Sequence, residues 1–330
     1  MKSQVINPVI ADVFRGPMVE SRHRGAFAVA DQNGRVVAGA GAFNSIFFPR
    51  SAIKAFQCLP LIESGAAARF GLNDEEIALC CSSHVGEPEH VRVARSILAK
   101  AGIDEACYEC GAHMPAAREA CYDLVRNGEK PLQVHNVCSG KHAGMLALAK
   151  HLGAPLEGYV TPDHPVQRAV AATLSRFCEL DLSQAPRGID GCSVPTWAMP
   201  MSKLAQGFAR LAEPKNDAAQ WILRAVKNHP ALIEGAGRFD TKIMQAVPRL
   251  FIKFGAEGVF CGTIPHAGLG FTLKCDDGAT RGAQVAVAEM LAALDVWQKP
   301  EQKALQTFAR EHITNWRKLD VGNVVAAELD

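Results

Sequence analysis

The chain has 330 residues, of which 48% are hydrophobic, so it can bury a large core in one large domain or in two closely joined lobes. Its 35 basic and 34 acidic side chains leave a net charge of +1 and form no long run of one sign. This balance excludes the basic surface expected of a protein that binds nucleic acid or an anionic membrane, and it favours a small molecule or a second copy of the chain as partner.

The amino-terminal segment and the cysteines indicate a compartment. MKSQVINPVIADVFRG lacks the basic stretch and long apolar core of an export signal, and no later segment approaches about 18 uninterrupted apolar residues. The 11 cysteines are an odd number, which suits buried or metal-binding thiols in a reducing environment. We therefore expect a cytoplasmic protein without a disulfide framework.

The first predicted element is a β-hairpin over residues 24–40. RGAFAVAD and RVVAGAG alternate as strands do, and Gln32-Asn33-Gly34 supplies the turn. Helical patterns dominate from Ser51 to about residue 230, in segments separated by proline and glycine: RSAIKAFQCLPLIESG, EPEHVRVARSILAKAG, SGKHAGMLALAKHLG, HPVQRAVAATLSRFCEL and NDAAQWILRAVKNHP. From Pro248 strand patterns return in RLFIKFG, GVFCGTIP and LGFTLKCDDG, and the helix ATRGAQVAVAEMLAALDVWQ follows.

The simplest assembly pairs the early hairpin with the late strands. The predicted fold class is α/β (α+β), with an antiparallel sheet built from both chain ends, residues 1–50 and 231–330. A mostly helical lobe of residues 51–230 is inserted between them. We expect a small-molecule site in the cleft between the lobes, because such clefts are common binding sites.

Ser51 and Lys54 stand three residues apart at the start of a predicted helix. Residues at i and i+3 share a helix face with side chains about 5 to 6 Å apart, so the hydroxyl and the amine can meet. A lysine amine so placed can take the proton of a serine nucleophile. The unpaired N–H groups of a helix start also favour negative charge on the serine oxygen or on a bound carboxylate.

Two other polar segments allow a simpler explanation. Ser82, Ser83 and His84 follow the apolar stretch EIALCC, and alone they are best explained as caps of the helix that begins near Glu87. Lys253 lies on a predicted strand, where an edge lysine is usually a solvated charge that blocks aggregation. If that strand lines the cleft, Lys253 instead offers a second amine beside the serine.

A possible metal site involves Cys138 and Lys141, three apart at a helix start, and Cys192 in a second turn. Two thiolates and a nitrogen suit zinc, with water in the fourth position. Lysine is an unusual ligand because its amine, with a reference pKa of about 10.4, must lose a proton. On spacing alone, buried unpaired cysteines are the simpler alternative. The pair Cys107 and Cys110 lacks a partner pair at zinc-finger distance, and we interpret it as structural.

Five ordered segments cover nearly the whole chain: FPRSAIKAFQ, CSSHVGEPEHV, CSGKHAGML, DGCSVPT and KFGAEGV. Together they resemble the class 3 L-asparaginases, the rhizobial-type asparaginase II family. The resemblance implies a fold like that of serine β-lactamases and penicillin-binding proteins, and a homodimer. It also implies hydrolysis of L-asparagine to L-aspartate and ammonia through an acyl-serine intermediate.

The resemblance also assigns residues. It implies one Ser-Lys pair of Ser51 with Lys54, and a second of Ser83 with Lys253. The positions that match the family's ligands for one zinc per chain are Cys138, Lys141 and Cys192. The residues in the same segments that are expected to shape the substrate pocket are Arg50, His84, His142, Asp190, Gly191 and Ser193. The chain departs from the Lys-Thr-Gly of many members by carrying Phe254, which removes a threonine contact with substrate.

Two other classes of protein compete with this interpretation. A β-lactamase or penicillin-binding protein uses the same serine and lysine spacing, but here Ser82-Ser83-His84 stands where those enzymes have Ser-Asp-Asn, and no export signal is seen. A non-enzymatic, zinc-stabilised interaction protein would need no lysine beside Ser51. We therefore expect an L-asparagine amidohydrolase.

Overall fold

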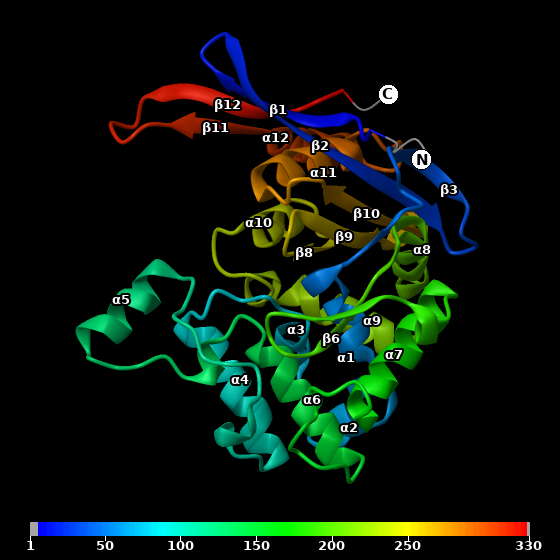
Figure 1. Ribbon diagram of the computed structural model, residues 1–330, viewed down its shortest axis with the longest axis vertical. Helices are drawn as coiled ribbons and strands as arrows, with labels where there is room; N and C mark the ends of the chain where they lie inside the picture. Colours follow the sequence, from blue (N-terminus) through cyan, green and yellow to red (C-terminus); the bar gives the residue numbers. More distant parts are fainter. Residues whose placement is uncertain (1–5, 329–330) are drawn as a thin grey trace. The chain divides into compact units, whose positions relative to one another are not determined.

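Contacts in the computed structural model, which describes residues 6–328, group the chain into two units (Figure 1). The sheet unit contains the chain up to Ala52, Met199–Ala212 and the chain from Lys242 on. The helical unit contains Ile53–Ala198 and Glu213–Thr241. Both chain ends therefore contribute to one unit, and most of the middle forms the other.

The sheet unit contains one large antiparallel sheet. Its strands are β1 (Val9–Arg15), β2 (Met18–Asp31), β3 (Val36–Ala40), β8 (Phe251–Gly255), β9 (Val259–Ile264), β10 (Leu269–Cys275), β11 (Arg310–Thr314) and β12 (Asp320–Ala326). The order is β11-β12-β1-β2-β10-β9-β8, and β3 pairs with β2. The hairpin of β2 and β3 and the pairing of β2 with β10 confirm the predicted sheet from both chain ends.

Helices cover both faces of this sheet. The helices are α8 (Met201–Leu211), α11 (Thr280–Ala292) and α12 (Lys299–Phe308). Ala28 and Ala30 of β2 pack against Ala205 of α8, whereas Val13 of β1 packs against Val285 of α11. Because side chains alternate along a strand, the two helices lie on opposite faces.

Helix α8 belongs to the sheet unit, although the helical pattern places residues 199–212 in the inserted lobe. The reason is a close approach between α8 and β10. A Cβ at Gly270 would collide with the backbone of Ala205 and Ala209. The Thr272 hydroxyl also donates a hydrogen bond to the Met201 carbonyl, 3.1 Å away. Just before α8, the two-residue strands β4 (Ile46–Phe47) and β7 (Met199–Pro200) pair.

The helical unit is built around α6, whose residues from Ser139 to Ala149 are all buried. Its helices are α1 (Lys54–Glu63), α2 (Ala66–Arg69), α3 (Asp74–Cys80), α4 (Pro88–Ala101), α5 (Arg118–Arg126), α6 (Ser139–His151), α7 (Pro165–Cys178) and α9 (Asp217–Asn228). α10 (Phe239–Ala246) is divided between the two units, and the hairpin of β5 (Arg187–Ile189) and β6 (Pro195–Trp197) lies in the helical unit. These helices confirm the helical pattern of the middle of the chain.

Two glycines let α3 lie directly against α6. A Cβ at Gly140 would collide with the Leu79 carbonyl, and one at Gly144 would lie 2.8 Å from the Cys80 sulfur. Residues four apart share a helix face, so the two glycines form one groove along α6. The end of α3, and the Ser82 segment after it, is thereby held against the start of α6.

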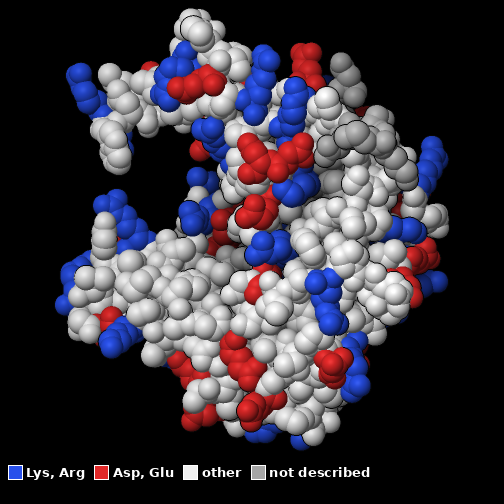
Figure 2. Space-filling view, viewed as in Figure 1, with Lys and Arg blue, Asp and Glu red and all other residues white. Residues whose placement is uncertain are grey.

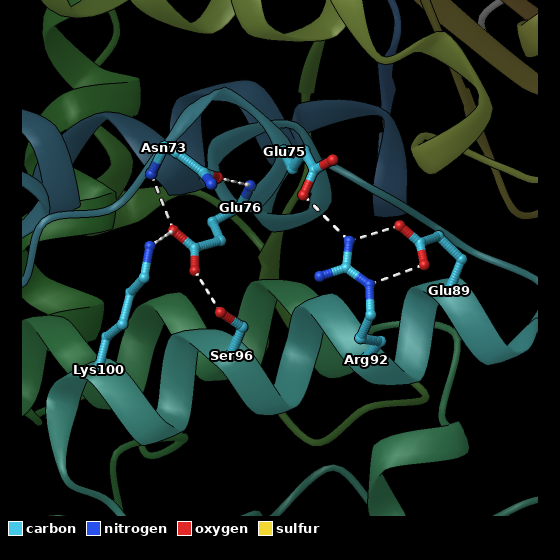
Figure 3. A network of polar contacts seen from close by, with 7 residues as sticks. All are labelled: Asn73, Glu75, Glu76, Glu89, Arg92, Ser96 and Lys100. Carbon is cyan, nitrogen blue, oxygen red and sulfur yellow. Dashed lines mark hydrogen bonds and ion pairs between the residues drawn. The ribbon is translucent and has the colours of Figure 1, made fainter.

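A network of charged side chains ties α3 to α4 on the other side (Figure 3). The buried carboxylate of Glu76 accepts from the Asn73 backbone N–H at 2.8 Å, from the Ser96 hydroxyl at 2.7 Å and from the Lys100 amine at 2.7 Å. The Asn73 side chain in turn accepts from the Glu76 N–H, which completes a capping box. Glu76 therefore fixes both the start of α3 and its position on α4.

The surface carries charges of both signs. Lys and Arg side chains are interspersed with Asp and Glu on the face shown in Figure 2, as the net charge of +1 leads one to expect. Among the described residues, the helices are too short or too polar to cross a membrane.

Candidate active site

Lys54, the first residue of α1, lies at the centre of a buried polar cluster in the helical unit. Its amine Nζ donates to the Ser82 carbonyl, to Ser83 Oγ at 2.9 Å and to Cys138 Sγ at 3.2 Å. Three acceptors match the three N–H groups of an ammonium. Within this unit, Lys54 is thus joined to Ser83.

The segment of Ser82, Ser83 and His84 is held extended by backbone hydrogen bonds on two sides. The Ser83 N–H donates to the Ile233 carbonyl at 2.8 Å, and the His84 N–H donates to the Val137 carbonyl at 3.1 Å. All three residues are buried. The alternative that these serines cap α4 is wrong, because the residue before α4 is Glu87, which lies beyond the segment.

His84 is a neutral donor. The Gly86 backbone N–H donates to its Nδ1 at 3.1 Å, so the ring proton lies on Nε2, which donates to Ser139 Oγ at 2.9 Å. Burial first, and then the charges of His90 and Lys54, hold the pKa of His84 well below its usual value. His84 therefore fixes Ser139 at the start of α6 and has no free lone pair to act as its base.

Two thiols and a second amine complete the lysine–thiol cluster, by which we mean Lys54, Ser83, Cys138, Lys141 and Cys192. The Lys141 amine donates to Cys192 Sγ at 3.0 Å. A hydrogen bond from Cys192, and then the charges of Lys54 and Lys141, hold the pKa of the Cys138 thiol well below its usual value. The pKa of Cys192 is raised by its hydrogen bond to Cys138 and by burial. Of the two sulfurs, Cys138 thus favours the thiolate.

Cys192 is presented by a tight turn between β5 and β6. The Asp190 N–H donates to the Val194 carbonyl and the Ser193 N–H to the Asp190 carbonyl, both at 2.9 Å, and Ser193 has a left-handed φ of 75°. The Asp190 carboxylate accepts from the Gly191 N–H at 2.8 Å. The negative charge of Asp190 also acts on the Lys141 amine. Although burial lowers the pKa of Lys141, the Cys192 and Cys138 sulfurs raise it, with a smaller contribution from Asp190.

The donor atoms of Cys138, Lys141 and Cys192 fit a zinc ion. All three residues are buried, and two sulfurs with one nitrogen form a donor set that zinc prefers. In a tetrahedral site, Zn–S bonds of about 2.3 Å and Zn–N bonds of about 2.0 Å separate sulfur and nitrogen by about 3.5 Å. The observed 3.0 Å between Lys141 Nζ and Cys192 Sγ requires only a small spreading of the ligands.

A second set of metal-type side chains lies in the sheet unit. Among the described residues, the ligand atoms of His23, Cys275 and Asp277 lie within 4.8 Å of one another. His23 Nδ1 donates to Asp277 at 2.7 Å, the Cys275 thiol donates to Asp277 at 2.9 Å, and Arg281 Nε donates to His23 Nε2 at 3.0 Å. These four residues form the Asp277 network. Each of these donors already has an acceptor, and Arg281 opposes a cation.

Ser51 lies in the sheet unit, in a 3-10 turn (Arg50–Ile53) that leads into α1. It is half-buried, and the residue before it, Arg50, has a left-handed φ of 52°. Such a conformation is strained for a residue with a Cβ and is typical of functional sites. The chain is thus bent sharply at the point where it presents Ser51.

Lys253 lies in the middle of β8, at the edge of the sheet, and is fully buried, so it is not a solvated edge charge. Its amine donates to the Phe254 carbonyl at 2.8 Å. A Cβ at Gly255 would lie 2.6 Å from the Pro49 carbonyl, so β8 ends against the segment that carries Ser51. Residues two apart share a strand face, and Lys253 therefore points to the side of that segment.

Two further side chains support the cluster without a sequence motif. The Tyr159 hydroxyl lies 2.7 Å from Nδ1 of His142, which is buried on α6 directly after Lys141. The His90 ring stacks on His84 with centroids 4.9 Å apart. Tyr159 lies in the connection after α6, and His90 lies in α4. Neither belongs to a recognisable motif, and the glycine spacing along α6 is the only sequence feature that indicates such close packing.

Some solved structures resemble this chain distantly. A β-lactamase from Mycobacterium bovis is 17% identical, with 86% of this chain and 94% of that chain covered and a TM-score of 0.38. A protein called Mglu, in its native form, is 15% identical, with 84% and 66% covered and a TM-score of 0.37. Mglu in its tris and glutamate form is 15% identical, with 89% and 65% covered and a TM-score of 0.37. At these values the similarity carries no inference about function.

No curated protein gives a match to the sequence. A family model described as L-asparaginase II, in contrast, matches residues 11–326. The matched range includes all of the residues predicted for the site.

Proposed function

Because the chain belongs to the L-asparaginase II family and is therefore an amidohydrolase of the asparaginase type, we propose that its substrate is L-asparagine. In this proposal the side-chain amide is hydrolysed to L-aspartate and ammonia through an acyl-serine intermediate. The observation that carries it is the buried amine of Lys54 in contact with Ser83 Oγ and Cys138 Sγ, in a chain of this family.

Ser51 is the nucleophile in this proposal. Its oxygen attacks the amide carbon while its proton passes to the amine of Lys54, and the C–N bond then breaks as ammonia leaves with that proton. Water hydrolyses the ester, which releases L-aspartate and restores the serine. The three-residue spacing to Lys54, the left-handed Arg50 and the side of β8 on which Lys253 lies all support this assignment.

The contacts of Lys54 are those of an ammonium, so in the proposal it relays the proton of Ser51 by giving one of its own protons to Ser83 as it accepts. We therefore give Ser83 the role of proton carrier. Its hydroxyl is 2.9 Å from Lys54 Nζ and can accept one proton while it donates another. The second pair, Ser83 with Lys253, would pass that proton on to the departing amide nitrogen, which leaves as ammonia.

One zinc ion per chain, held by Cys138, Lys141 and Cys192, is part of the proposal. When bound, zinc would supply a positive charge that positions or polarises a substrate oxygen. Both Lys141 and Cys192 must lose their protons to bind it, which couples zinc affinity to pH. Asp190, whose charge reaches Lys141, would hold the turn that carries Cys192 in place.

A homodimer in the cytoplasm completes the proposal. The family resemblance implies the dimer, and the 11 cysteines, all free in the structure, support a reducing compartment. Light scattering of the purified protein tests the assembly state.

The substrate is tested by measuring ammonia and L-aspartate release from L-asparagine, with L-glutamine and a chromogenic β-lactam as comparison substrates. We expect equal amounts of both products from L-asparagine and no cleavage of the β-lactam. Cleavage of the β-lactam in preference to L-asparagine would favour a penicillin-recognising enzyme, and no turnover of any substrate would favour a zinc-stabilised interaction protein.

Ser51→Ala tests the nucleophile. We expect the rate of ammonia release to fall at least about a thousandfold, because loss of a serine nucleophile removes the covalent route. Thermal unfolding should stay close to that of the wild-type protein, since a small side chain at a helix start costs at most about 1 kcal/mol in capping. If the variant kept more than a few per cent of the activity, Ser83 would replace Ser51 as the candidate.

A further inference from the structure

Tyr159 connects His142 to the backbone of Glu109. The His142 ring is fully buried near the start of α6. The phenolic oxygen of Tyr159 lies 2.7 Å from His142 Nδ1, and the Glu109 N–H donates to the same oxygen at 3.0 Å. The three groups form a continuous chain of hydrogen bonds.

This chain of hydrogen bonds fixes which ring nitrogen of His142 carries the proton. A backbone N–H only donates, so the Tyr159 oxygen accepts from Glu109 and its own proton goes to His142 Nδ1. Nδ1 is therefore an acceptor without hydrogen, and the neutral ring carries its proton on Nε2. That Nε2–H group is buried and has no hydrogen-bond partner among the described residues.

The unpartnered group belongs to the surroundings of the lysine–thiol cluster. Cys138 is the residue before α6, and the His142 backbone N–H in the first turn donates to the Cys138 carbonyl at 3.1 Å. Lys141 directly precedes His142 in α6, and the Lys54 amine donates to Cys138 Sγ at 3.2 Å. The start of α6 adds the positive end of a helix dipole.

A buried donor without a partner costs free energy that a bound acceptor recovers. The Lys54 amine and the helix start make an anionic oxygen the favoured acceptor. Resting on the proposed function for the identity of the substrate, we propose that His142 Nε2–H binds the α-carboxylate of L-asparagine and of the product L-aspartate. Tyr159 is then a positioning residue, because it sets the tautomer of His142.

Calorimetric titration with L-aspartate and with β-alanine, which is L-aspartate without its α-carboxylate, tests this assignment. His142→Phe keeps a ring of similar size but removes the donor, and His142→Gln keeps an N–H donor. We expect His142→Phe to weaken L-aspartate binding about ten- to hundredfold, because a hydrogen bond to a charged group is lost. Binding of β-alanine should not change, and His142→Gln should restore most of the L-aspartate affinity.

His151→Phe is the matched control. It places the same substitution on the same helix, about 13 Å further along, at a half-buried ring whose Nδ1 is buried and has no partner among the described residues. This variant should bind L-aspartate like the wild-type protein. Tyr159→Phe leaves His142 in place and frees its tautomer, so it should weaken L-aspartate binding by a smaller factor, and it serves as the test if a His142 variant does not fold. Zinc content and unfolding temperature should match the wild-type values in each folded variant.

Equal L-aspartate binding by His142→Phe and by the wild-type protein would overturn the assignment. Equal weakening for L-aspartate and β-alanine, or a wild-type protein that binds no L-aspartate, would do the same. The ammonia assay separates this inference from the proposed function. Binding that depends on His142 in a protein that releases no ammonia would remove the proposed function alone, whereas ammonia release with binding independent of His142 would remove this inference alone.

Discussion

The lysine–thiol cluster and the Asp277 network contain similar side chains but satisfy them differently. In the Asp277 network, the donors of His23, Cys275 and Arg281 all have acceptors, and the charge of Arg281 offsets that of Asp277. Around the cluster, two buried lysines donate to thiols, and Ser82 Oγ and His142 Nε2 have no hydrogen-bond partner within the part of the chain that the structure describes. A closed network of this kind stabilises the fold, whereas an open one retains the capacity to bind a ligand.

Lys54→Met tests this comparison most directly, because it removes the central cation of the lysine–thiol cluster and keeps a similar side-chain volume. We expect ammonia release to fall at least about a thousandfold, because the proton of Ser51 loses its acceptor. The unfolding temperature should shift by less than about 5 °C, since methionine fills the volume of the lysine chain and removes the cost of burying its charge. Steady-state kinetics and calorimetry measure the two effects. A large drop in unfolding temperature would mean that the cluster, too, is built mainly for stability.

Metal content distinguishes the two regions directly. Cys192→Ala should lower zinc from about one ion per chain to near zero, because the site loses one of its three protein ligands. Cys275→Ala, the matched change in the Asp277 network, should leave the zinc content unchanged. Elemental analysis of protein purified without a histidine tag gives both numbers. The proposed zinc site fails if the wild-type protein lacks zinc in the absence of chelators, or if Cys192→Ala retains it.

The smallest expected effect is the loss of stability on removal of the Asp277 charge. Partial burial raises the pKa of Asp277, but hydrogen bonds from Cys275, the Ala279 N–H and His23 outweigh this effect and hold the pKa at about 2, below its ordinary value of 3.8. A depressed pKa stabilises the fold above the unfolded value, and this contribution is lost as the pH falls from about 4 to about 2. Because the side chain is 49% exposed, we expect Asp277→Asn to cost only about 1 kcal/mol at pH 7.

Urea unfolding of Asp277→Asn and of the wild-type protein between pH 7 and pH 2 measures this contribution. The difference in free energy of unfolding should shrink towards zero at the acidic end, while zinc content and ammonia release at pH 7 stay at wild-type values. A difference independent of pH, or a loss of activity, would contradict the view of a closed structural network.

Hydrophobic patterns predicted the elements that bury most of their apolar side chains and are bounded by clear turns. The hairpin of β2 and β3, the strands β8 to β10 and the long helices all belong to this class. The strands at the far edge did not follow from pattern: β11 (REHIT) is mostly exposed, and β12 contains glycine and asparagine, which disfavour strands. The pairing of β12 with β1 is a long-range contact that local sequence does not encode, and β11 joins the sheet through β12.

The candidate site was predictable as a set of motifs but not as a set of contacts. The spacing of Ser51 and Lys54 indicates a pair, whereas the contacts of Lys54 with Ser83 and Cys138 join residues far apart in the chain. The helix-cap explanation of the serines was wrong because Glu87 and His90 provide the start of α4 themselves. No sequence motif identifies Tyr159, because its hydroxyl contacts His142 only in the folded chain.

Gly140 and Gly144 restrict the substitutions that this sequence can tolerate. Every amino acid reachable from a glycine codon by one base change carries a Cβ, and a Cβ at either position would meet Leu79 or Cys80. Any such change would push the end of α3, and with it Ser83, away from Lys54. In a survey of random single-nucleotide variants, Gly140 and Gly144 should therefore tolerate substitution as poorly as the lysines whose positions depend on them. This holds although glycine has no side chain that could take part in the chemistry.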